Sequence, residues 1–553
     1  MSKTKLEIKI VYKALIVFFI IFLIIPLIVL LFKSFQVEDG IGIFNYIKVL
    51  KDVELIASIK NSIFISLCTA VITTLISFIL AYVLNSTRVF KPLKKIINTG
   101  IAIPMLLPSI AYGFAIIYSF GKQGLLTKIF GRELFEIYGF NGLLIGYVIY
   151  TLPSAFLIIN NSFKYVDKKF IVVSKLMGDN SIRRFINTIL RPLIGSIAGA
   201  FVLAFILSFT DFGIPASVGG NYNVVATYLY QTMLGAIPNF NLGAVIAVLM
   251  LLPAVVGVLI LQYVERFNFN YDKFTKVEVE INKLRDIILG TISMGIILGI
   301  LSIFIVMFIT PFMKNFPYDM SFTLKYFINT LHTNNILQVY KNSIIVATFS
   351  AIIGTIVAYA LAMINSRTSI SKRAKLNIDI ISMVTNTVPG MVLGLAYLML
   401  FNKSDLKGTF IIIIISNIVH FFTTPYLMGK NALSKMNPSW ETTGELMGDS
   451  WIKTIFRVVI PNSITTIIDM VSYYFINSMV TISAIIFLVG SRTTVITTKI
   501  KEFQHYAKFN EIFVLSIIIF LTNIIVKLSC DYLKKRITTE KIIKNKFNRG
   551  KLT

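Results

Sequence analysis

Twelve stretches of mostly apolar residues, each roughly 20 residues long, recur along this chain of 553 residues. An α-helix rises about 1.5 Å per residue, so roughly 20 apolar residues are enough to cross the ~30 Å hydrocarbon layer of a membrane. We therefore expect an all-α polytopic membrane protein with about 12 transmembrane helices. The expected spans are residues 13–32, 62–85, 97–120, 141–161, 193–212, 242–262, 286–310, 343–363, 378–401, 409–429, 463–489 and 510–530.

The composition supports this interpretation. Hydrophobic residues make up 56% of the chain and charged residues only 14%, and the mean hydropathy is +0.78. Such a composition is typical of a protein that lies in lipid rather than one with a water-facing surface. The two cysteines, Cys68 and Cys530, lie far apart in apolar stretches. Neither a disulfide framework nor a thiolate metal site is therefore expected.

The lysines and arginines lie between the apolar stretches, and their distribution predicts the orientation of the chain. Cytoplasmic loops of membrane proteins are enriched in these residues. With the N-terminus inside, the cationic segments on the inner side are residues 88–95, 168–191, 266–285, 367–375 and 534–546. The outer segment 213–241 has no lysine or arginine. We expect both termini in the cytoplasm of a bacterial cell. A net charge of +27 could indicate a nucleic-acid partner, but the cations are dispersed between apolar stretches and form no basic face with stacking aromatic residues, so no nucleic-acid partner is expected.

Two short sequences are repeated. Lys60-Asn61-Ser62-Ile63 returns 281 residues later as Lys341-Asn342-Ser343-Ile344, and Leu176-Met177-Gly178-Asp179 returns 270 residues later as Leu446-Met447-Gly448-Asp449. Such self-similarity indicates two homologous halves. Because each half has an even number of expected spans, the two halves share one orientation as a parallel repeat. The predicted parts are a first six-helix half at 1–263, a cytoplasmic linker at 264–285, a second six-helix half at 286–533 and a basic cytoplasmic tail at 534–553.

The second repeated sequence lies between the fourth and fifth expected spans of each half, near 165–192 and near 435–461, and hence in the cytoplasm. We call these segments the first and second repeated loops. In the first, apolar residues at helical spacing are interrupted at Gly178, which predicts two short helices joined by a turn. Asp179 or Asn180 can cap the second short helix, as can Asp449 or Ser450 in the other half. A merely connecting loop is the alternative, but two copies at equivalent places favour a docking element.

The repeated loops resemble the coupling loops of binding-protein-dependent ABC importer permeases. Those loops read approximately Glu-Ala-Ala, three residues and Gly, with a proline about a dozen residues later. The first copy is Val172 to Gly178 with Phe185 and Pro192, and the second is Thr442 to Gly448 with Phe456 and Pro461. The Glu-Ala-Ala part is degenerate here, and Glu441 or Glu445 is the possible acidic counterpart in the second copy.

Three further segments resemble one branch of that family, the fused permeases of ferric iron, thiamine and 2-aminoethylphosphonate uptake. They are Asp211 to Pro215, Gly219 to Thr227, and Met479 to Leu488. The resemblance implies a type I importer fold, two copies of a cytoplasmic ABC ATPase, and an extracellular or lipid-anchored substrate-binding protein. The Gly-Gly-Asn-Tyr-Asn run at 219–223 favours a solute like 2-aminoethylphosphonate, followed by ferric iron.

The same resemblance assigns ATPase coupling to residues of both repeated loops. They are Leu176, Met177, Gly178, Asp179, Phe185, Pro192, Glu441, Glu445, Leu446, Met447, Gly448, Asp449 and Pro461. The chain itself is expected to bind no cofactor, because Gly121-Lys122 and Gly429-Lys430 are not followed by the Ser or Thr of a phosphate-binding loop. ATP would be hydrolysed by the partner subunits.

Candidates for the translocation path are polar residues in and near the third, fifth and eleventh expected spans. They are Ser109, Tyr112, Asp211, Asn477, Ser478, Thr481 and Ser483. A carboxylate such as Asp211 at membrane depth usually faces a pathway or a partner. At a helix end it can instead act as a cap, and small polar residues can instead join neighbouring helices.

No catalytic or metal site is expected. The three histidines, His332, His420 and His505, lie in separate regions without a recognisable ligand set. Two classes of transport protein remain. One is the permease subunit of an ATP-driven importer, and the other is a self-sufficient secondary transporter or channel with twelve spans. The two repeated loops favour the importer, since a secondary carrier has no motor to dock.

Overall fold

A computed structural model describes residues 2–37, 40–163, 166, 169–235, 237–265, 282–332 and 335–549. The chain divides into two compact units. We call Ser34–His332 with Ile500–Ser516 the α4 unit, and Met1–Lys33, Thr333–Lys499 and Ile517–Thr553 the α17 unit, each after its longest internal helix. Most of the predicted linker 264–285 lies outside the described residues.

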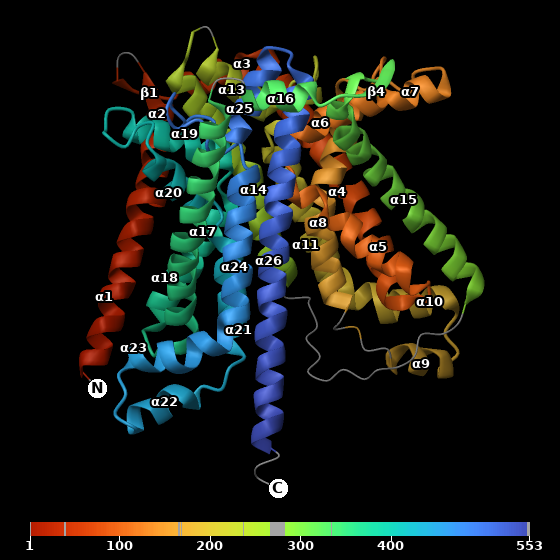
Figure 1. The fold of residues 1–553 in the computed structure, drawn as a ribbon. Coiled ribbons are helices and arrows are strands. Elements are labelled where there is room, and N and C mark those ends of the chain that lie inside the picture. The colour runs from red at the N-terminus through yellow and green to blue at the C-terminus, as the bar shows by residue number, and fades with distance from the viewer. Residues whose placement is uncertain are drawn as a thin grey trace. The chain divides into compact units, whose positions relative to one another are not determined.

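The α4 unit is helical apart from two short hairpins (Figure 1). Its elements are β1 (Gln36–Val37), β2 (Gly40–Ile41), α3 (Phe44–Lys51), α4 (Val53–Ser86), α5 (Lys91–Ala102), η2 (Pro104–Leu106), α6 (Ser109–Phe120), α7 (Leu125–Phe130), α8 (Phe140–Ser162), α9 (Lys169–Leu176), α10 (Ser181–Phe185), η4 (Ile186–Leu190), α11 (Arg191–Thr210), α12 (Gly213–Val218), α13 (Val225–Leu234), α14 (Phe240–Glu265), α15 (Lys283–Ile309), η5 (Thr310–Phe312), β3 (Met313–Asn315), β4 (Asp319–Phe322) and α16 (Lys325–His332).

The α17 unit repeats this helical plan. Its elements are α1 (Ser2–Phe19), η1 (Ile20–Ile24), α2 (Ile25–Phe35), α17 (Ile336–Arg367), α18 (Lys372–Thr387), α19 (Gly390–Phe401), α20 (Phe410–His420), α21 (Thr423–Ser434), α22 (Ser439–Leu446), α23 (Trp451–Thr454), η6 (Ile455–Val459) and α24 (Ile460–Val480). The last residues of α2 belong to the α4 unit. The helices α25 (Ile496–His505) and α26 (Phe509–Arg549) contribute residues to both units.

The transmembrane prediction is confirmed, with a bend in three of the twelve spans and an early end in a fourth. Among the described residues, nine helices are long and apolar enough to cross a membrane, and three further spans are bent pairs of helices. The expected span 97–120 is bent by 112°, the span 378–401 by 102° and the span 409–429 by 53°. Each of these three spans therefore consists of two helices joined at a bend.

The two sharpest bends occur at equivalent prolines, Pro108 and Pro389. Proline disfavours helical geometry in the residue before it. Leu107 and Val388 accordingly have extended backbones, with ψ of 146° and 114°. The first helix of each pair therefore ends before its proline, and the chain turns before α6 or α19 begins.

The expected span 463–489 ends earlier than predicted. The helix α24 stops at Val480, and Thr481 has an extended backbone with ψ of 142°. Residues 481–495 form turns and loops before α25 begins. The apolar run Ile482 to Val489 suggested a longer helix, but it is used for a buried non-helical segment in which Ile482, Ile485 and Leu488 are buried.

The first helix of each sequence half packs in the unit formed by the other half. In the α17 unit, the Phe19 ring lies 4.6 Å from the Phe422 ring, between centroids. The Tyr397 hydroxyl donates to the Phe22 carbonyl at 2.5 Å. The long α1–η1–α2 span from residue 6 onward is thus held by α19 and by the junction between α20 and α21 of the second half.

In the same way, α15, the first helix of the second half, packs in the α4 unit. The backbone N–H of Arg88 donates to the Asp286 carboxylate at 3.1 Å, and the Phe304 ring lies 5.5 Å from the Tyr112 ring. Ile297 lies only 3.0 Å from the point where a Cβ on Gly100 would be, so α15 and α5 pack closely. The compact units therefore cut across the predicted half boundary at each first helix.

Candidate coupling and translocation sites

The first repeated loop contains two short helices, α9 and α10, joined by a turn, as predicted. Gly178 has a φ of +78°, the left-handed conformation that glycine accepts without strain. The N–H of Asp179 donates to the Ser174 carbonyl at 3.1 Å, the long-range bond of a Schellman ending. The Asn180 side chain then caps α10 by accepting from the Arg183 N–H at 2.8 Å.

The second repeated loop has the same construction in α22 and α23. Gly448 has a φ of +77°, and the N–H of Asp449 donates to the Gly444 carbonyl at 2.9 Å. The Ser450 hydroxyl caps α23 by accepting from the Lys453 N–H at 3.3 Å. The two loops thus agree in helix ending, turn and cap, although Ser450 replaces Asn180.

The aspartates of the repeated sequence do not cap these helices. The Asp179 carboxylate accepts from the Ser174 hydroxyl at 2.7 Å and pairs with Arg183 at 3.3 Å. Asp449 pairs with Lys453 in the same way. Two capping residues were predicted as alternatives in each loop. In the structure Asn180 and Ser450 are the caps, and the two aspartates instead stabilise the turn.

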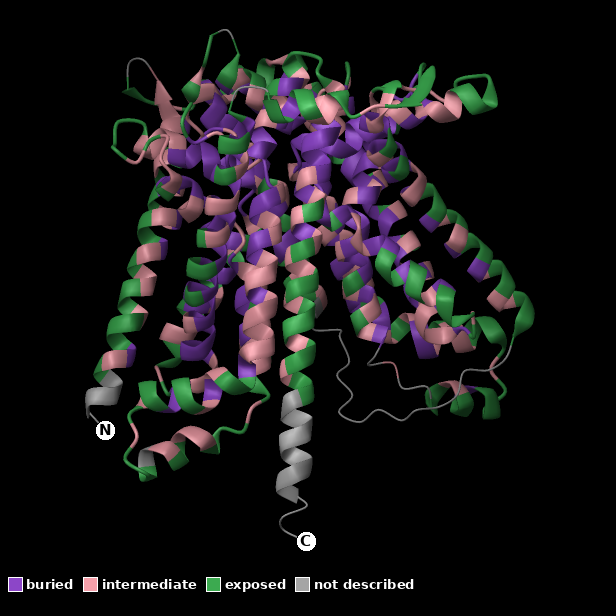
Figure 2. Ribbon diagram, in the orientation of Figure 1, coloured by how far each residue is buried: buried purple, intermediate pink, exposed green. Residues whose placement is uncertain are grey.

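Two Leu–Met pairs project from the turns. Leu176 is 84% exposed and Met177 78%, and Leu446 is 84% exposed and Met447 79%. Figure 2 shows α9 and the ends of α22 largely in the colour of exposed residues. Large apolar side chains so exposed at two equivalent positions mark a surface that another protein can cover.

Phe185 packs against the α4 unit instead of projecting from it. Its ring centroid lies 6.1 Å from that of Phe78 and 5.8 Å from that of Tyr82, both on α4. It fastens the loop to its own unit. In the second loop the residue at the corresponding place, Phe456, is 66% exposed.

Each repeated loop continues into a long span through a π-helical turn. The turns η4 and η6 precede α11 and α24, in which Pro192 and Pro461 occupy the second position. Proline removes a backbone donor from a helix, and a wider π turn lets the chain remain helical around it. Residues Ser181–Thr210 and Trp451–Val480 therefore form continuous 30-residue helices.

Glu441 is tied to α17 rather than presented to solvent. Its carboxylate accepts two hydrogen bonds from the Arg367 guanidinium, at 2.6 and 2.5 Å. Arg367 also donates to the carbonyls of Met436 and Asn437, each at 2.7 Å. The side chain of Glu445 lies outside the described residues.

The structure brings together two predicted pathway residues of the α4 unit. The Ser109 hydroxyl donates to the Asp211 carboxylate at 2.7 Å, and the other carboxylate oxygen accepts from the Ile214 N–H at 2.8 Å. Asp211 thus joins the start of α6 to the start of α12. The Tyr112 hydroxyl donates to the Pro104 carbonyl across the bend. Ser109, Tyr112 and Asp211 therefore each make a hydrogen bond that links neighbouring segments of the α4 unit.

The predicted pathway residues of the α17 unit lie around the end of α24. The Asn477 amide donates to the Tyr473 carbonyl of its own helix at 2.8 Å. The Ser478 hydroxyl is buried without a hydrogen-bond partner, and Thr481 is 8% exposed. Ser483 follows in the turn, with Oγ 2.7 Å from the point where a Cβ on Gly390 would be.

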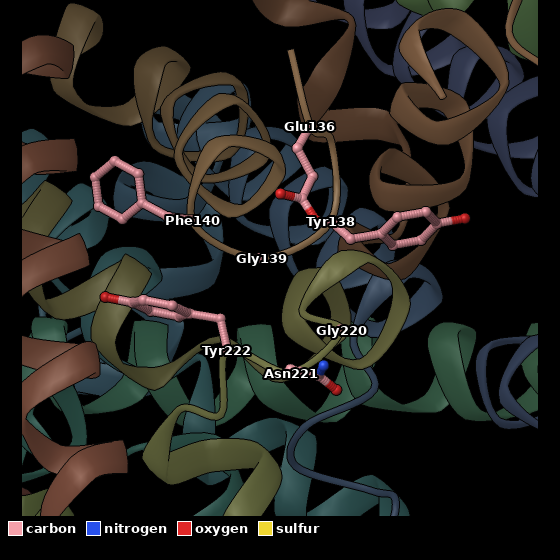
Figure 3. Close-up of a pocket in the computed structure, with 7 residues that line it drawn as sticks. All are labelled: Glu136, Tyr138, Gly139, Phe140, Gly220, Asn221 and Tyr222. Carbon is pink, nitrogen blue, oxygen red and sulfur yellow. The ribbon is translucent and has the colours of Figure 1, made fainter. Parts of the chain in front are cut away.

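A pocket in the α4 unit was not foreseen from the sequence (Figure 3). Its volume is about 500 Å³, and it is lined by Glu136, Tyr138, Gly139, Phe140, Gly220, Asn221 and Tyr222. The side chains of Tyr138 and Tyr222 point away from each other in Figure 3, so their oxygens do not converge on one ligand. The pocket includes part of the Gly-Gly-Asn-Tyr-Asn run.

The duplicated plan of spans, each with a helix–turn–helix loop running into a long helix, defines a fused, multi-pass permease. The chain belongs to the family described as the binding-protein-dependent transport system inner membrane component, which matches residues 73–268 and again residues 354–539. The double match confirms the predicted resemblance to fused ABC importer permeases. It also decides against a secondary transporter or channel.

Individual relatives cover most of the chain. A putative ferric transport system permease protein of Haemophilus influenzae is 26% identical over 511 residues, which span 87% of this chain and 77% of that protein. A ferric transport system permease protein of Actinobacillus pleuropneumoniae is 24% identical over 511 residues, 88% of this chain and 72% of that protein. A thiamine transport system permease protein of Haemophilus influenzae is 24% identical over 385 residues, 65% and 67% of the two chains. These relatives are transport permeases, as expected for a transport subunit rather than an enzyme.

Proposed function

We propose that this permease passes ferric iron from an extracellular or lipid-anchored binding protein to the cytoplasm, driven by two copies of a separate ABC ATPase. The choice of iron rests on the two relatives named as ferric permeases, which match 87% and 88% of the chain. The chain itself would bind no cofactor, and the ATPases would bind and hydrolyse ATP.

The proposed coupling to the ATPases rests on one observation, the two exposed Leu–Met pairs at equivalent positions of the repeated loops. Leu176 with Met177, and Leu446 with Met447, are exposed on turns of matching geometry. Each pair would insert into one ATPase. Two such sites in one chain call for two motor subunits, which is why we propose that stoichiometry.

The continuous helices that follow the loops support transmission of force. A push on α10 is carried directly into α11, and a push on α23 into α24, because each pair belongs to one 30-residue helix. Phe185 and the Arg367–Glu441 pair hold the loops to α4 and α17. A firmly seated loop is what rigid-body rocking of a permease requires.

The proposed orientation places both termini and both repeated loops in the cytoplasm. The cationic segments predict this through the positive-inside rule. Within the α17 unit, the N-terminal end of α1 lies at the same end as α22 and α23 (Figure 1), which agrees with a shared side.

The test is reconstitution of the full chain in liposomes with its ATPase and binding protein. We expect ATP-dependent uptake of ferric iron, and weaker ATPase stimulation when Leu176 and Met177, or Leu446 and Met447, are both replaced by Asp. Each pair alone should weaken coupling, and both together should abolish it. Uptake in the absence of any ATPase would overturn the proposal.

The solute is tested in the same liposomes. Binding protein loaded with 2-aminoethylphosphonate, the solute that the run at 219–223 favours, is compared with binding protein loaded with ferric iron. Uptake of the phosphonate without uptake of iron would reject the iron assignment and leave the coupling part intact.

A further inference from the structure

Several buried side chains of the α17 unit have polar atoms without a hydrogen-bond partner, and three of them lie on α20 and near the end of α24. They are Asn417 with both amide atoms, His420 with Nδ1, and Ser478 with Oγ. Asn417 is 0% exposed, so its amide cannot be satisfied by bulk water. We call these three residues the Asn417 cluster.

The three side chains lie on elements that pack together. Asn417 and His420 are three residues apart on α20 and therefore share a helix face. Two bonds hold α20 beside α24 and the segment that follows it. The Tyr474 hydroxyl donates to the Ile418 carbonyl at 3.3 Å, and the Ser416 hydroxyl donates to the Ala484 carbonyl at 3.4 Å. Ser478 lies on α24, between these two contact points in the chain.

The cluster adjoins the sharp bend of the second half. His420 Nε2 lies 3.2 Å, and Ser483 Oγ 2.7 Å, from the point where a Cβ on Gly390 would be. Gly390 begins α19 directly after the 102° bend, and the loop after α24 is non-helical. Irregular backbone at membrane depth is tolerated only where it is buried in protein or lines a water-filled cavity.

The serine at the corresponding position of the first half is hydrogen-bonded. Ser208 lies three residues before the end-capping Asp211 of α11, as Ser478 lies three residues before Thr481 at the end of α24. The Ser208 hydroxyl donates to the Ala204 carbonyl of its own helix at 2.8 Å. Ser478 makes no such bond. A buried polar group without a partner lowers stability by about 1–3 kcal/mol, so the cluster is costly to keep.

We propose that Asn417, His420 and Ser478 form a polar binding site for the transported solute, which supplies the missing hydrogen bonds through its own oxygen atoms or those of its hydration shell. This inference rests on the proposed transport function. The helix α20 and residues 471–489 contain no Asp, Glu, Lys or Arg, so the site binds through neutral groups. Binding that is favourable but weak allows a solute to enter and then to leave.

The experiment compares Ser478→Ala and Asn417→Leu with Ser208→Ala in liposomes that contain the ATPase and ferric iron loaded on its binding protein. For the two cluster variants, we expect the iron moved per ATP hydrolysed to fall by roughly ten-fold, as for the loss of a buried hydrogen bond. Their ATPase rate should stay within about two-fold of the parent, and their thermal unfolding midpoint should be unchanged or higher, because an unpaired polar group has been removed. Ser208→Ala should leave the ratio unchanged.

Two results would overturn the inference. One is an unchanged ratio of iron to ATP in both cluster variants, which would leave an ordered water molecule as the only partner of the cluster. The other is a fall in unfolding midpoint for Asn417→Leu, which would make Asn417 a structural residue. Failure of the parent protein to move iron at all would count against the proposed solute instead, so the two failures are distinguishable.

Discussion

Arg367 and Glu441 are joined by a bidentate ion pair, with hydrogen bonds of 2.6 and 2.5 Å, although 74 residues separate them in the chain. The Arg367 side chain is 4% exposed and the Glu441 side chain 14%. The planar guanidinium matches the carboxylate in two parallel bonds. This pair fixes the second repeated loop to the end of α17. Thr87 and Ile171, at the corresponding positions of the first half, have side chains that cannot form such an ion pair.

Replacement of Arg367 by Ala should destabilise the α17 unit. It leaves the Glu441 carboxylate unpaired and removes the donors to two backbone carbonyls. The loss of one partner of a buried ion pair costs about 3–5 kcal/mol. We expect a clear fall in the thermal unfolding midpoint of the purified protein and weaker stimulation of the ATPase.

Arg183→Ala is the matched control for this prediction. The Arg183 side chain is 74% exposed and its pairing with Asp179 is 3.3 Å long, so its loss should cost no more than about 1 kcal/mol. Equal midpoints for the two variants would contradict the assignment of Arg367 as a clamp.

Gly178→Val and Gly448→Val should impair coupling through the backbone rather than through crowding. No atom lies within 4 Å of the point where a Cβ would be at either glycine, but their φ values are +78° and +77°. A β-branched residue in this region costs about 1–3 kcal/mol. ATPase stimulation and uptake should be lost while membrane insertion persists. Asparagine tolerates this conformation, so Gly178→Asn and Gly448→Asn should retain most activity.

Gly444→Ala should disturb the second repeated loop more than Ser174→Ala disturbs the first. A Cβ on Gly444 would lie 2.4 Å from the Thr454 hydroxyl, and Thr454 is buried and branched. Overpacking of this kind costs about 1–3 kcal/mol. Ser174→Ala loses one hydrogen bond to Asp179, worth about 0.5–1.5 kcal/mol, and gains helix propensity. Proteolysis of the loops under native conditions would rank the variants, and the reverse order would contradict the packing argument.

Lys501 of α25 should make stability depend on pH. Burial lowers the pKa of Lys501, because the charged form is disfavoured away from water. Burial of the charged ammonium destabilises the folded protein at a pH below the folded-state pKa of Lys501. This destabilisation decreases as the pH rises toward 10.5, the pKa of lysine in the unfolded chain. The unfolding midpoint should therefore rise as the pH increases toward 10.5, and Lys501→Met should raise the midpoint at about pH 7 and reduce that pH dependence. Lys508→Met, at an exposed site, should change neither quantity; a pH dependence that survives Lys501→Met would refute the prediction.

The elements that the sequence predicted are those specified by short-range patterns. The capping residues and the repeated Leu-Met-Gly-Asp act within one or two helical turns, and an apolar stretch of membrane length acts within a single helix. The helix–turn–helix loops followed from them, including the left-handed glycines. The choice between Asp179 and Asn180 as the capping residue could not be predicted, because both side chains can reach the free N–H groups. The contacts of Asp179 with Ser174 and Arg183 leave Asn180 as the cap.

The features that the sequence did not predict depend on long-range packing. Pro108 and Pro389 signalled an interruption, but a bend of 112° or 102° requires a partner segment on which the bent chain can pack. The early end of α24 was not predicted because the residues that follow it are apolar. In the sequence, such a buried non-helical segment looks the same as a continuing helix. The Arg367–Glu441 pair and the exchange of first helices join residues far apart in sequence, for which a single sequence holds no pairing signal.

The exchange of first helices also sets the order in which the protein can be built. The span formed by α1, η1 and α2 is synthesised first, but the Tyr397 hydroxyl that bonds to Phe22 follows 375 residues later. At about 5–20 residues per second, the ribosome needs on the order of 20 to 75 seconds to supply it. During that interval the helix must persist alone in lipid. Its most apolar window is only 22% buried in the finished fold, and it has the most apolar window of the nine unbroken spans. Its apolar surface therefore suits it to remain stable in the bilayer before the helices that bind it have been synthesised.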